Sequence, residues 1–543
     1  MTKRYSIGLD FGTLSARAII ANVANGETLP YESVFNYPHA VMQELNGTLL
    51  PKNYALQHPS DYIKALEFLL CDVINKNHIE KDSIIGIGID FTDCTVLPVT
   101  KDMTPLCMLD EYKNEPHAYA KLWKHHAKEE YTDIVSAAAH SYHDDILSVT
   151  GGKMTSEFLI PKLYEIFREA PQIYNDTYKF ISAGDFIASL LIGKKLIHSK
   201  AYSAKQHYNG NKYPTREFFS SIDEGFADVY EKKTVLSLSS VEKSAGYLCE
   251  EWAIKTGLSS SVAISAPILD AHSAIAASGI EEGRATLVLG TSAVFETLTK
   301  GKKSVDGALA TSFESIAEGF TTIEASIAAM GDLFDWYIKN NLPASYESKA
   351  RELKLNAHQY LRSLAEKQEI GAHGLIALDW WNGSRAIVLD NNLSGMILGL
   401  RLSTKPEDIY RALIESAIFA IRQIFDSFIS AGIKIDRLSA TGGIALKDPF
   451  LMQICASVLN IPIDCLASKQ ATALGSAIYG AVAGGAYESV TDASRAMRSK
   501  TSITYYPIKN DHIAYEKIYK EYLRLYKYFS NENHVMEVLR NNK

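Results

Sequence analysis

The segment GLDFGTLSAR at residues 8–17 places an aspartate, a glycine, a threonine and an arginine directly after a short apolar stretch. Gly12 allows a tight turn in which backbone N–H groups approach a bound anion, and Thr13 adds a hydroxyl donor. Asp10 repels a phosphate by itself, so its expected role is to hold Mg²⁺, directly or through water. Arg17 supplies a charge-assisted contact. These residue types predict a phosphate-binding turn with a magnesium ligand; a plain hairpin is the alternative.

A second turn of the same chemistry, Gly290-Thr291-Ser292, follows the apolar residues 286–289. It lacks an acid, as expected if two hairpins hold one triphosphate from opposite sides and share one magnesium ion. A third motif, Gly442-Gly443, lies between a predicted strand and a predicted helix, where bare backbone packs against a purine and ribose. The alternative for this third motif is an ordinary strand-to-helix turn.

Other classes of site are not indicated. The sequence has no G-x-x-x-x-G-K-[ST] loop, no strand-linked G-x-G-x-x-G and no H-R-D or D-F-G motif. A formal net charge of -8 gives no basic surplus for nucleic acid. Six cysteines without a C-x-x-C pair indicate reduced thiols. No uninterrupted apolar run reaches the roughly 18 residues of a membrane span. We therefore expect a cytoplasmic protein that binds neither nucleic acid nor membrane.

The elements that would carry these turns repeat along the chain. Residues 5–10 read as a buried strand and 16–23 as its partner, and residues 286–299 return to the order strand, turn, strand. Residues 84–90 predict another buried strand, and 262–280 predict a strand, an aspartate-bearing loop and a helix. A chain of 543 residues exceeds one compact domain, so the repeat predicts two similar α/β domains with a cleft between them.

In this order and spacing, the motifs resemble the FGGY family of carbohydrate kinases from about residue 4 to about residue 486. Kinases of that family pair two ribonuclease-H-like, actin-like ATPase domains around an ATP cleft. The resemblance implies an N-terminal domain at 1–278 with the sugar site, the first phosphate hairpin and the catalytic base. It implies a C-terminal domain at 284–486 with the second hairpin and the adenosine site. A helical tail is expected at 487–543.

Within the family, four further features look most like the members that phosphorylate L-ribulose. These are LWKHH with Trp123, AYSAKQHY with Lys205, ILDAHSA with Asp270 and TTIEASIAAMGDLFDWY with Glu324. The matching implies that Asp270 is the general base, that Trp123 faces the carbon skeleton, and that Lys205 and Glu324 bond sugar hydroxyls. From residue type alone, Asp270 reads as a helix N-cap and the other three as ordinary core or surface residues.

The resemblance thus implies an enzyme of L-arabinose catabolism that converts L-ribulose to L-ribulose 5-phosphate with ATP and Mg²⁺. Its partners would be the sugar and ATP. The resemblance does not decide whether the protein forms a homodimer. The implied ATP site comprises Asp10, which is also the metal ligand, with Gly12, Thr13, Arg17, Gly290, Thr291, Gly442 and Gly443.

Four positions depart from the pattern of ribulose-directed members. Asp93 lies where relatives tend to have a small residue near the sugar, so it joins the substrate-binding candidates and can change which pentulose fits. His125 replaces a usual aspartate. Thr441 replaces a third glycine, and Asp448 replaces an asparagine or serine. We expect these two replacements to alter the affinity for the nucleotide.

Two alternative functions stay open. One is another FGGY kinase that acts on D-ribulose, xylulose or a polyol. Xylulose-directed members tend to carry Trp-x-Asp-x-Arg, which is missing after Trp123. The other is an ATPase switch like actin or Hsp70 that phosphorylates nothing, although such a switch has no use for Asp270 together with Trp123 and Glu324.

Overall fold

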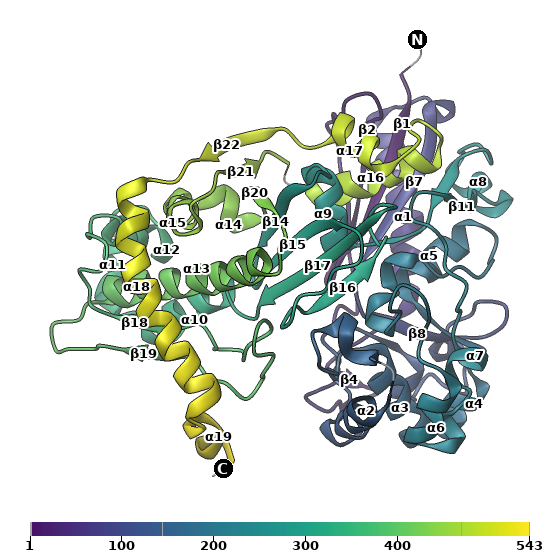
Figure 1. Ribbon diagram of the computed structural model, residues 1–543. Coiled ribbons are helices and arrows are strands. Elements are labelled where there is room, and N and C mark those ends of the chain that lie inside the picture. The colour runs from purple at the N-terminus through teal and green to yellow at the C-terminus, as the bar shows by residue number, and fades with distance from the viewer. Residues whose placement is uncertain (1–2, 144, 469, 542–543) are drawn as a thin grey trace.

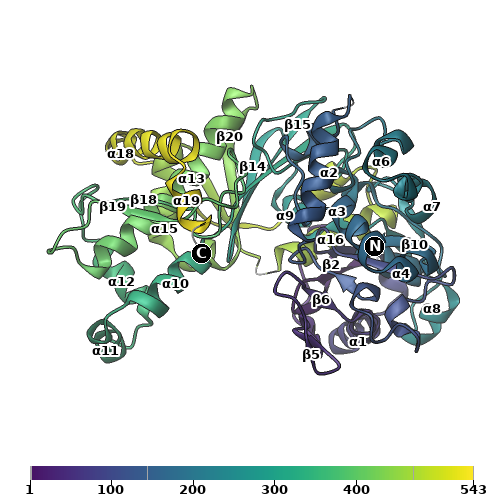
Figure 2. The same cartoon turned by 90° about the horizontal axis from the view of Figure 1, so that it is seen from below.

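Two large sheets organise the computed structural model, which describes residues 3–143, 145–468 and 470–541 (Figure 1). One sheet belongs to the first half of the chain and the other to the second half. In Figure 1 the purple and blue first half lies on the right and the green second half on the left, with strands β14–β17 between them. Figure 2 shows the same two masses side by side from below.

The first sheet has the strand order β11-β12-β7-β1-β2-β3. At its centre β1 (Tyr5–Phe11) pairs antiparallel with β2 (Ser15–Asn22) and parallel with β7 (Ile84–Phe91). The remaining strands are β3 (Ser33–Asn36), β11 (Ser244–Tyr247), β12 (Ala263–Ser265) and β13 (Ile268–Leu269), which pairs with β7. β1 and β7 are buried almost throughout, which explains why both read as continuous apolar runs.

The second sheet repeats this arrangement in the order β16-β17-β15-β14-β20-β21-β22. Here β14 (Gly283–Leu289) pairs antiparallel with β15 (Ala293–Lys300) and parallel with β20 (Ile435–Thr441). The other strands are β16 (Ala310–Phe313), β17 (Phe320–Ile327), β21 (Ile463–Leu466) and β22 (Thr501–Tyr505). In the first sheet three antiparallel strands (β3, β2, β1) and in the second sheet four (β16, β17, β15, β14) are followed by two parallel ones. The predicted pair of similar α/β domains is therefore confirmed.

A smaller four-stranded sheet builds a lobe beside the first domain. Its order is β10-β8-β9-β6, with β6 (Leu56–Gln57), β8 (Val96–Val99), β9 (Ala120–Lys121) and β10 (Lys179–Ser182). Helices α2 (Glu129–Ser141), α3 (Leu159–Glu169), α4 (Pro171–Asp176), α6 (Arg216–Ile222) and α7 (Val229–Lys233) enclose a separate aromatic core with it. We call these strands and helices the small lobe.

The remaining helices cover the two large sheets and the outer part of the second domain. Those near the first sheet are α1 (Pro59–Asn77), α5 (Ala183–Leu191), α8 (Glu250–Thr256), α9 (Asp270–Ser278), α16 (Ala471–Ala483) and α17 (Val490–Met497). The second domain has α10 (Gly331–Asn341), α11 (Ala344–Glu352), α12 (Ala357–Ala365), α13 (Pro406–Ser430), α14 (Gly443–Lys447) and α15 (Pro449–Leu459). Short hairpins pair β4 (Glu44–Leu45) with β5 (Thr48–Leu49) and β18 (Ile376–Leu378) with β19 (Met396–Leu398).

Helix α16 lies between β21 and β22 of the second sheet in sequence but packs against β1 and β7 of the first. Figure 1 shows it beside these strands, together with α17. The contact is a close backbone approach, because a Cβ added to Gly88 of β7 would lie 1.7 Å from the Ser476 carbonyl oxygen. The sequence division at residue 278 or 284 therefore differs from the packing, since a segment of the second half completes the first domain.

The expected helical tail at 487–543 is also part of the sheet and core of the second domain. It supplies strand β22 to the second sheet and helices α18 (Lys509–Lys527) and α19 (Val535–Asn541). Four tyrosines at spacings of four, three and four residues are buried against the second-domain core: Tyr515, Tyr519, Tyr522 and Tyr526. Within the three described ranges, none of the helices combines the length and apolarity needed to cross a bilayer.

We expect Gly88→Ala to lower stability, because the new methyl group overlaps the α16 backbone. Overpacking of this kind costs about 1–3 kcal/mol or more. Thermal or urea unfolding measures the loss. Gly443→Ala is the matched control, since an added Cβ there meets nothing within 4 Å. Equal melting temperatures for Gly88→Ala and the wild type would contradict the direct contact between helix and sheet.

Candidate active site

The first predicted phosphate turn joins β1 to β2. The Gly12 N–H donates to the Ser15 carbonyl at 3.0 Å and closes the turn tightly. Asp10 near the end of β1 is the register partner of Arg17 on β2, and Arg17 Nε lies 3.6 Å from Asp10 Oδ2. Arg17 therefore counters the charge of Asp10, and it lies outside the residues that line the cavities described below.

Asp10 has a second carboxyl group beside it. Its register partner on the parallel strand β7 is Asp90, which is fully buried. Hydroxyls of α16 bond both groups: Thr472 donates to Asp10 Oδ2 and Ser476 donates to Asp90 Oδ2, each at 2.6 Å. Burial, followed by the charge of Asp10, raises the pKa of Asp90 well above its usual value. Burial beside Asp10 thus favours the protonated form of Asp90.

The second predicted turn joins β14 to β15 and has the same form. The Gly290 N–H donates to the Ser292 carbonyl at 2.9 Å. The start of α10 fixes this turn from behind, since Met330 N–H donates to the Thr291 carbonyl at 2.8 Å and Gly331 N–H to the Gly290 carbonyl at 3.0 Å. The two turns therefore present similar backbone from the two domains.

A cavity of about 270 Å³ brings both turns together with the sugar-site candidates. Thr13 comes from the first turn and Ser292 from the second. The five predicted substrate residues all line it: Asp93, Trp123, Lys205, Asp270 and Glu324. Residues more than 300 positions apart in sequence thus meet in one place, which is the arrangement that transfer between two bound substrates requires.

Asp270 is the first residue of α9, directly after the short strand β13. Its Oδ1 accepts the N–H of the next residue, Ala271, at 2.8 Å. The N-cap of α9 is Leu269, whose side chain makes no capping hydrogen bond, so the expectation that Asp270 is the N-cap is wrong. Burial, and then the charges of Asp10, Asp93 and Glu324, raise the pKa of Asp270 to about 7. A carboxyl group with a pKa near neutrality is suited to proton transfer.

Among the described residues, Lys205 is the cation that forms ion pairs with the acidic residues lining this cavity. Its Nζ lies 2.8 Å from Asp93 Oδ2 and 3.4 Å from Glu324 Oε2. Burial disfavours the charged lysine, but the two carboxylates outweigh burial and hold the pKa of Lys205 well above its usual value. Burial likewise raises the pKa of Asp93, yet Lys205 overcomes it and keeps Asp93 below its usual pKa. Asp93 is therefore a charged part of this cavity.

A larger cavity of about 610 Å³ lies in the second domain. Gly290 and Thr291 line one end, and Gly443 at the start of α14 lines another part. Gly442 is the residue before α14 and has φ +99°, which an L-residue rarely adopts, and an added Cβ would lie 2.3 Å from the Leu289 carbonyl oxygen. Gly442 thus serves the backbone bend, and Gly443 leaves open space in the cavity.

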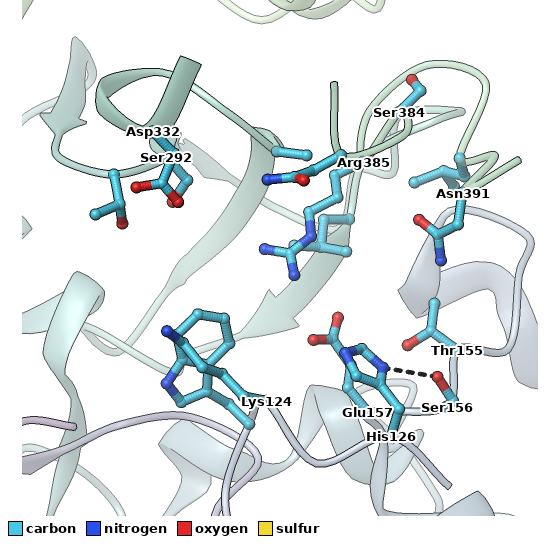
Figure 3. Close-up of a pocket in the computed structure, with 16 residues that line it drawn as sticks. Lys124, His126, Thr155, Ser156, Glu157, Ser292, Asp332, Ser384, Arg385 and Asn391 are labelled. Carbon is cyan, nitrogen blue, oxygen red and sulfur yellow. Dashed lines mark hydrogen bonds between the residues drawn. The ribbon is translucent and has the colours of Figure 1, made fainter. Parts of the chain in front are cut away.

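A third cavity of about 440 Å³ connects the other two (Figure 3). It shares Trp123, Ser292 and Arg385 with the smaller cavity, and Thr291 and Asp332 with the larger one. In Figure 3 the Arg385 guanidinium points toward Lys124, and its central carbon lies 5.9 Å from the centre of the Trp123 ring. The three cavities are therefore parts of one continuous cleft between the domains and the small lobe.

The sequence argument assigned no role to three ionisable residues in or next to this cleft. Asp90 ends a strand that was predicted, but no role was assigned to it. Glu296 on β15 is the register partner of Glu324 on β17 and is fully buried. Within the described part of the chain no hydrogen-bond partner reaches either Glu296 oxygen, and burial together with Glu324 raises its pKa well above the usual value. Arg385 lies in a loop without a recognisable motif.

The departures noted in the sequence fall in different places. His125 is buried in the small lobe, where its Nε2 lies 3.0 Å from Glu165 and 3.1 Å from Lys121 Nζ. It therefore points away from the sugar-site cavity. Asp448 caps α15 by accepting the Leu451 N–H at 3.0 Å, and it lines the larger cavity. Thr441 ends β20 and is buried.

Solved structures with actin-like ATPase domains share this architecture. A xylulose kinase from Lactobacillus acidophilus superposes with a TM-score of 0.81 at 19% identity, over 97% of this chain and 99% of that one. Glycerol kinase from Plasmodium falciparum with ADP gives 0.77 at 18%, over 97% and 98%. At these identities the likeness shows the fold, and it confirms the predicted fold class.

Sequence comparison gives the family. The models of the FGGY family of carbohydrate kinases match residues 5–277 with the N-terminal domain and 285–484 with the C-terminal domain. The chain belongs to this family, and is therefore an ATP-using carbohydrate kinase. It is 38% identical to ribulokinase from Bacillus licheniformis over 97% of both chains. It is also 38% identical to ribulokinase from Halalkalibacterium halodurans, over 99% of this chain and 98% of that one.

We predict that Asp93→Asn shifts the pH dependence of the reaction. A base must be ionised to act, so activity rises with pH through the pKa of Asp270, and the Asp93 charge raises that pKa. Removing the charge lowers the pKa of Asp270, and the acid limb of kcat/KM for the sugar moves to lower pH. Asp93→Glu keeps the charge and is the control. An acid limb that stays in place or moves upward contradicts the proximity of these two groups.

We also predict that Gly443→Ala raises KM for ATP by about tenfold, corresponding to roughly 1.4 kcal/mol. An added methyl group would occupy the open space of the larger cavity without touching the protein. KM for the sugar and the melting temperature stay unchanged. Gly442→Ala is the contrasting variant and lowers the melting temperature, because its Cβ meets the Leu289 carbonyl. If Gly443→Ala left KM for ATP unaltered, adenosine would have to bind elsewhere.

Proposed function

We propose that this kinase transfers the γ-phosphate of ATP to the terminal hydroxyl of L-ribulose and forms L-ribulose 5-phosphate. One observation carries the proposal: Asp270, Trp123, Lys205 and Glu324 line the same cavity as Thr13 of the first turn. The full-length similarity to relatives named ribulokinase supports this substrate. The activity belongs to L-arabinose catabolism, and its use of ATP favours a cytoplasmic location.

In this proposal Asp270 is the general base. Its carboxylate accepts the proton of the terminal hydroxyl while the oxygen bonds to the γ-phosphorus. The bond between that phosphorus and the β–γ bridging oxygen breaks, and ADP leaves with the electron pair. Phosphoryl transfer passes through a loose transition state, so orientation of the hydroxyl and neutralisation of charge contribute most. The pKa of about 7 suits Asp270 to this step.

Two carboxyl groups at neighbouring strand ends support a magnesium site. The donors there are all oxygens, from Asp10, Asp90 and the Thr472 hydroxyl, and oxygen is the ligand type that Mg²⁺ prefers. Asp10 would hold the ion directly or through water. Bound there, Mg²⁺ would offset the negative charge of the phosphates.

The other roles follow from the same layout. We assign the sugar to Asp93, Trp123, Lys205 and Glu324, and the phosphates to the turns at 12–13 and 290–291, with Arg17 acting through Asp10. Gly442 and Gly443 would accommodate adenosine. Residues 1–278 would form the sugar-binding N-terminal domain, completed by α16, and residues 284–486 the nucleotide-binding C-terminal domain, with 487–543 as a tail.

A coupled ADP-release assay over L-ribulose, D-ribulose, D-xylulose, L-xylulose and ribitol tests the proposal. We expect the highest kcat/KM with L-ribulose. In Asp270→Asn we expect kcat to fall about 10²- to 10⁴-fold, the usual contribution of a general base. ATP affinity of this variant should stay close to that of the wild type.

The same assay separates the alternatives. A higher kcat/KM with xylulose, D-ribulose or ribitol assigns the protein to another member of the family. Steady ADP release that no sugar accelerates would indicate an ATPase switch and would overturn the kinase proposal. Lys153→Met is the control and should leave kcat and KM at the wild-type values. This lysine bonds the Val388 and Leu389 carbonyls and does not line the sugar-site cavity.

A further inference from the structure

The first phosphate turn is attached to the small lobe through the side chain of Thr13. The indole Nε1–H of Trp123 donates to Thr13 Oγ1 at 3.1 Å. Gln57 Nε2 donates to the Thr13 carbonyl at 2.6 Å. Both donors come from the four-stranded sheet, because Gln57 ends β6 and Trp123 follows β9, which pairs with β6. Two strands of the small lobe thus fix one residue of the turn.

The direction of the first bond decides what the Thr13 hydroxyl is able to do. A threonine hydroxyl has one proton and two acceptor lone pairs, whereas an indole N–H is only a donor. Trp123 therefore occupies a lone pair of Thr13 Oγ1 and leaves its proton for another acceptor. Thr13 lines the cavity in which the two phosphate turns meet, so the acceptor on that side would be a phosphate oxygen.

The side chain of Trp123 is half-buried, and the backbone before it is anchored by a buried lysine. Lys162, whose side chain is fully buried, donates to the carbonyl of the preceding Leu122 at 2.7 Å and to the Cys94 carbonyl at 2.8 Å. Lys124 Nζ lies 4.9 Å from the centre of the Trp123 ring, and the Arg385 guanidinium carbon lies 5.9 Å from it. The same ring lines the sugar-site cavity. The indole therefore connects that cavity with the turn.

We propose that Trp123 is a positioning residue that couples the sugar site to the phosphate site by orienting the Thr13 hydroxyl proton toward the nucleotide. The proposal rests on the proposed function for the identity of the sugar, but the Trp123–Thr13 bond and its effect on nucleotide binding are independent of it. A sugar that packs on the indole restrains it and hence restrains Thr13. By linkage, nucleotide bound at Thr13 strengthens sugar binding by the same factor.

A double-mutant cycle tests this coupling. Binding of a non-hydrolysable ATP analogue with Mg²⁺ is measured by calorimetry in wild type, Trp123→Phe, Thr13→Val and the double variant, without sugar. Phenylalanine keeps an aromatic face but has no N–H. We expect Trp123→Phe to weaken nucleotide binding about threefold to tenfold, the range of one hydrogen bond. In the Thr13→Val background, the Trp123→Phe change should have no further effect on nucleotide binding.

Matched variants separate positioning from simple loss of structure. Thr13→Ser keeps the hydroxyl and should preserve the effect of Trp123→Phe. Lys153→Met changes a residue outside the sugar-site cavity and should leave nucleotide affinity without sugar at the wild-type value. Melting temperatures of all variants identify any that fail to fold. If a Trp123 variant fails to fold, nucleotide affinity is compared between Thr13→Ser, which keeps the hydroxyl, and Thr13→Val, which lacks it.

Two outcomes would overturn the inference. One is unchanged nucleotide affinity in Trp123→Phe. The other is an equal loss from Trp123→Phe in the Thr13→Val and wild-type backgrounds, which would show that the indole acts by another route. Addition of L-ribulose gives the second measurement, since its presence should tighten nucleotide binding in wild type and not in Trp123→Phe. A wild type that binds no L-ribulose would defeat the proposed function, while the nucleotide cycle would still decide the coupling.

Discussion

The base of the cleft holds more carboxyl groups than cations, and the fold has to compensate for this excess. The groups are Asp10, Asp90, Asp93, Asp270, Glu296 and Glu324. Two carboxylates 4 Å apart repel by about 4 kcal/mol at an effective dielectric constant of 20. Burial raises the pKa values of Asp90 and Glu296, and Lys205 bridges Asp93 and Glu324. These effects offset part of the negative charge of the cleft.

The sheet topology explains why the acids gather. Asp10 and Asp90 lie at matching positions of the parallel strands β1 and β7, and Asp270 follows β13, which also pairs with β7. Carboxyl ends of parallel strands meet at one edge, and a crevice outside that edge is where α/β proteins bind ligands. Helix α16 reaches this edge from the second half of the chain and bonds both Asp10 and Asp90. The acid pair therefore depends on contacts between the two halves.

The sequence was sufficient for features that are local. Strands, turns and the Asp270 loop are encoded by neighbouring residues, and repetition predicted the second domain. Glu296 could not be found this way, because its importance comes from the antiparallel register that sets it opposite Glu324, and register is not visible in a single strand. The place of α16 on the first sheet was missed for the same reason. Its small residues indicate close packing, but not which strands they pack against.

The charge balance also bears on which sugars the cavity accepts. The Lys205 ammonium has three N–H groups and two carboxylate neighbours, at 2.8 and 3.4 Å, so one donor is left for a ligand. The carboxylates of Asp93 and Glu324 keep lone pairs that accept hydrogen bonds from hydroxyl groups. A neutral polyhydroxylated sugar satisfies such a wall, since its hydroxyls donate to the acids and accept from the lysine. An anionic sugar acid would add another negative charge where the fold already offsets several, and desolvation would make that repulsion more costly. In the proposed function, the carboxylate of Asp93 therefore favours binding of neutral sugars over sugar acids.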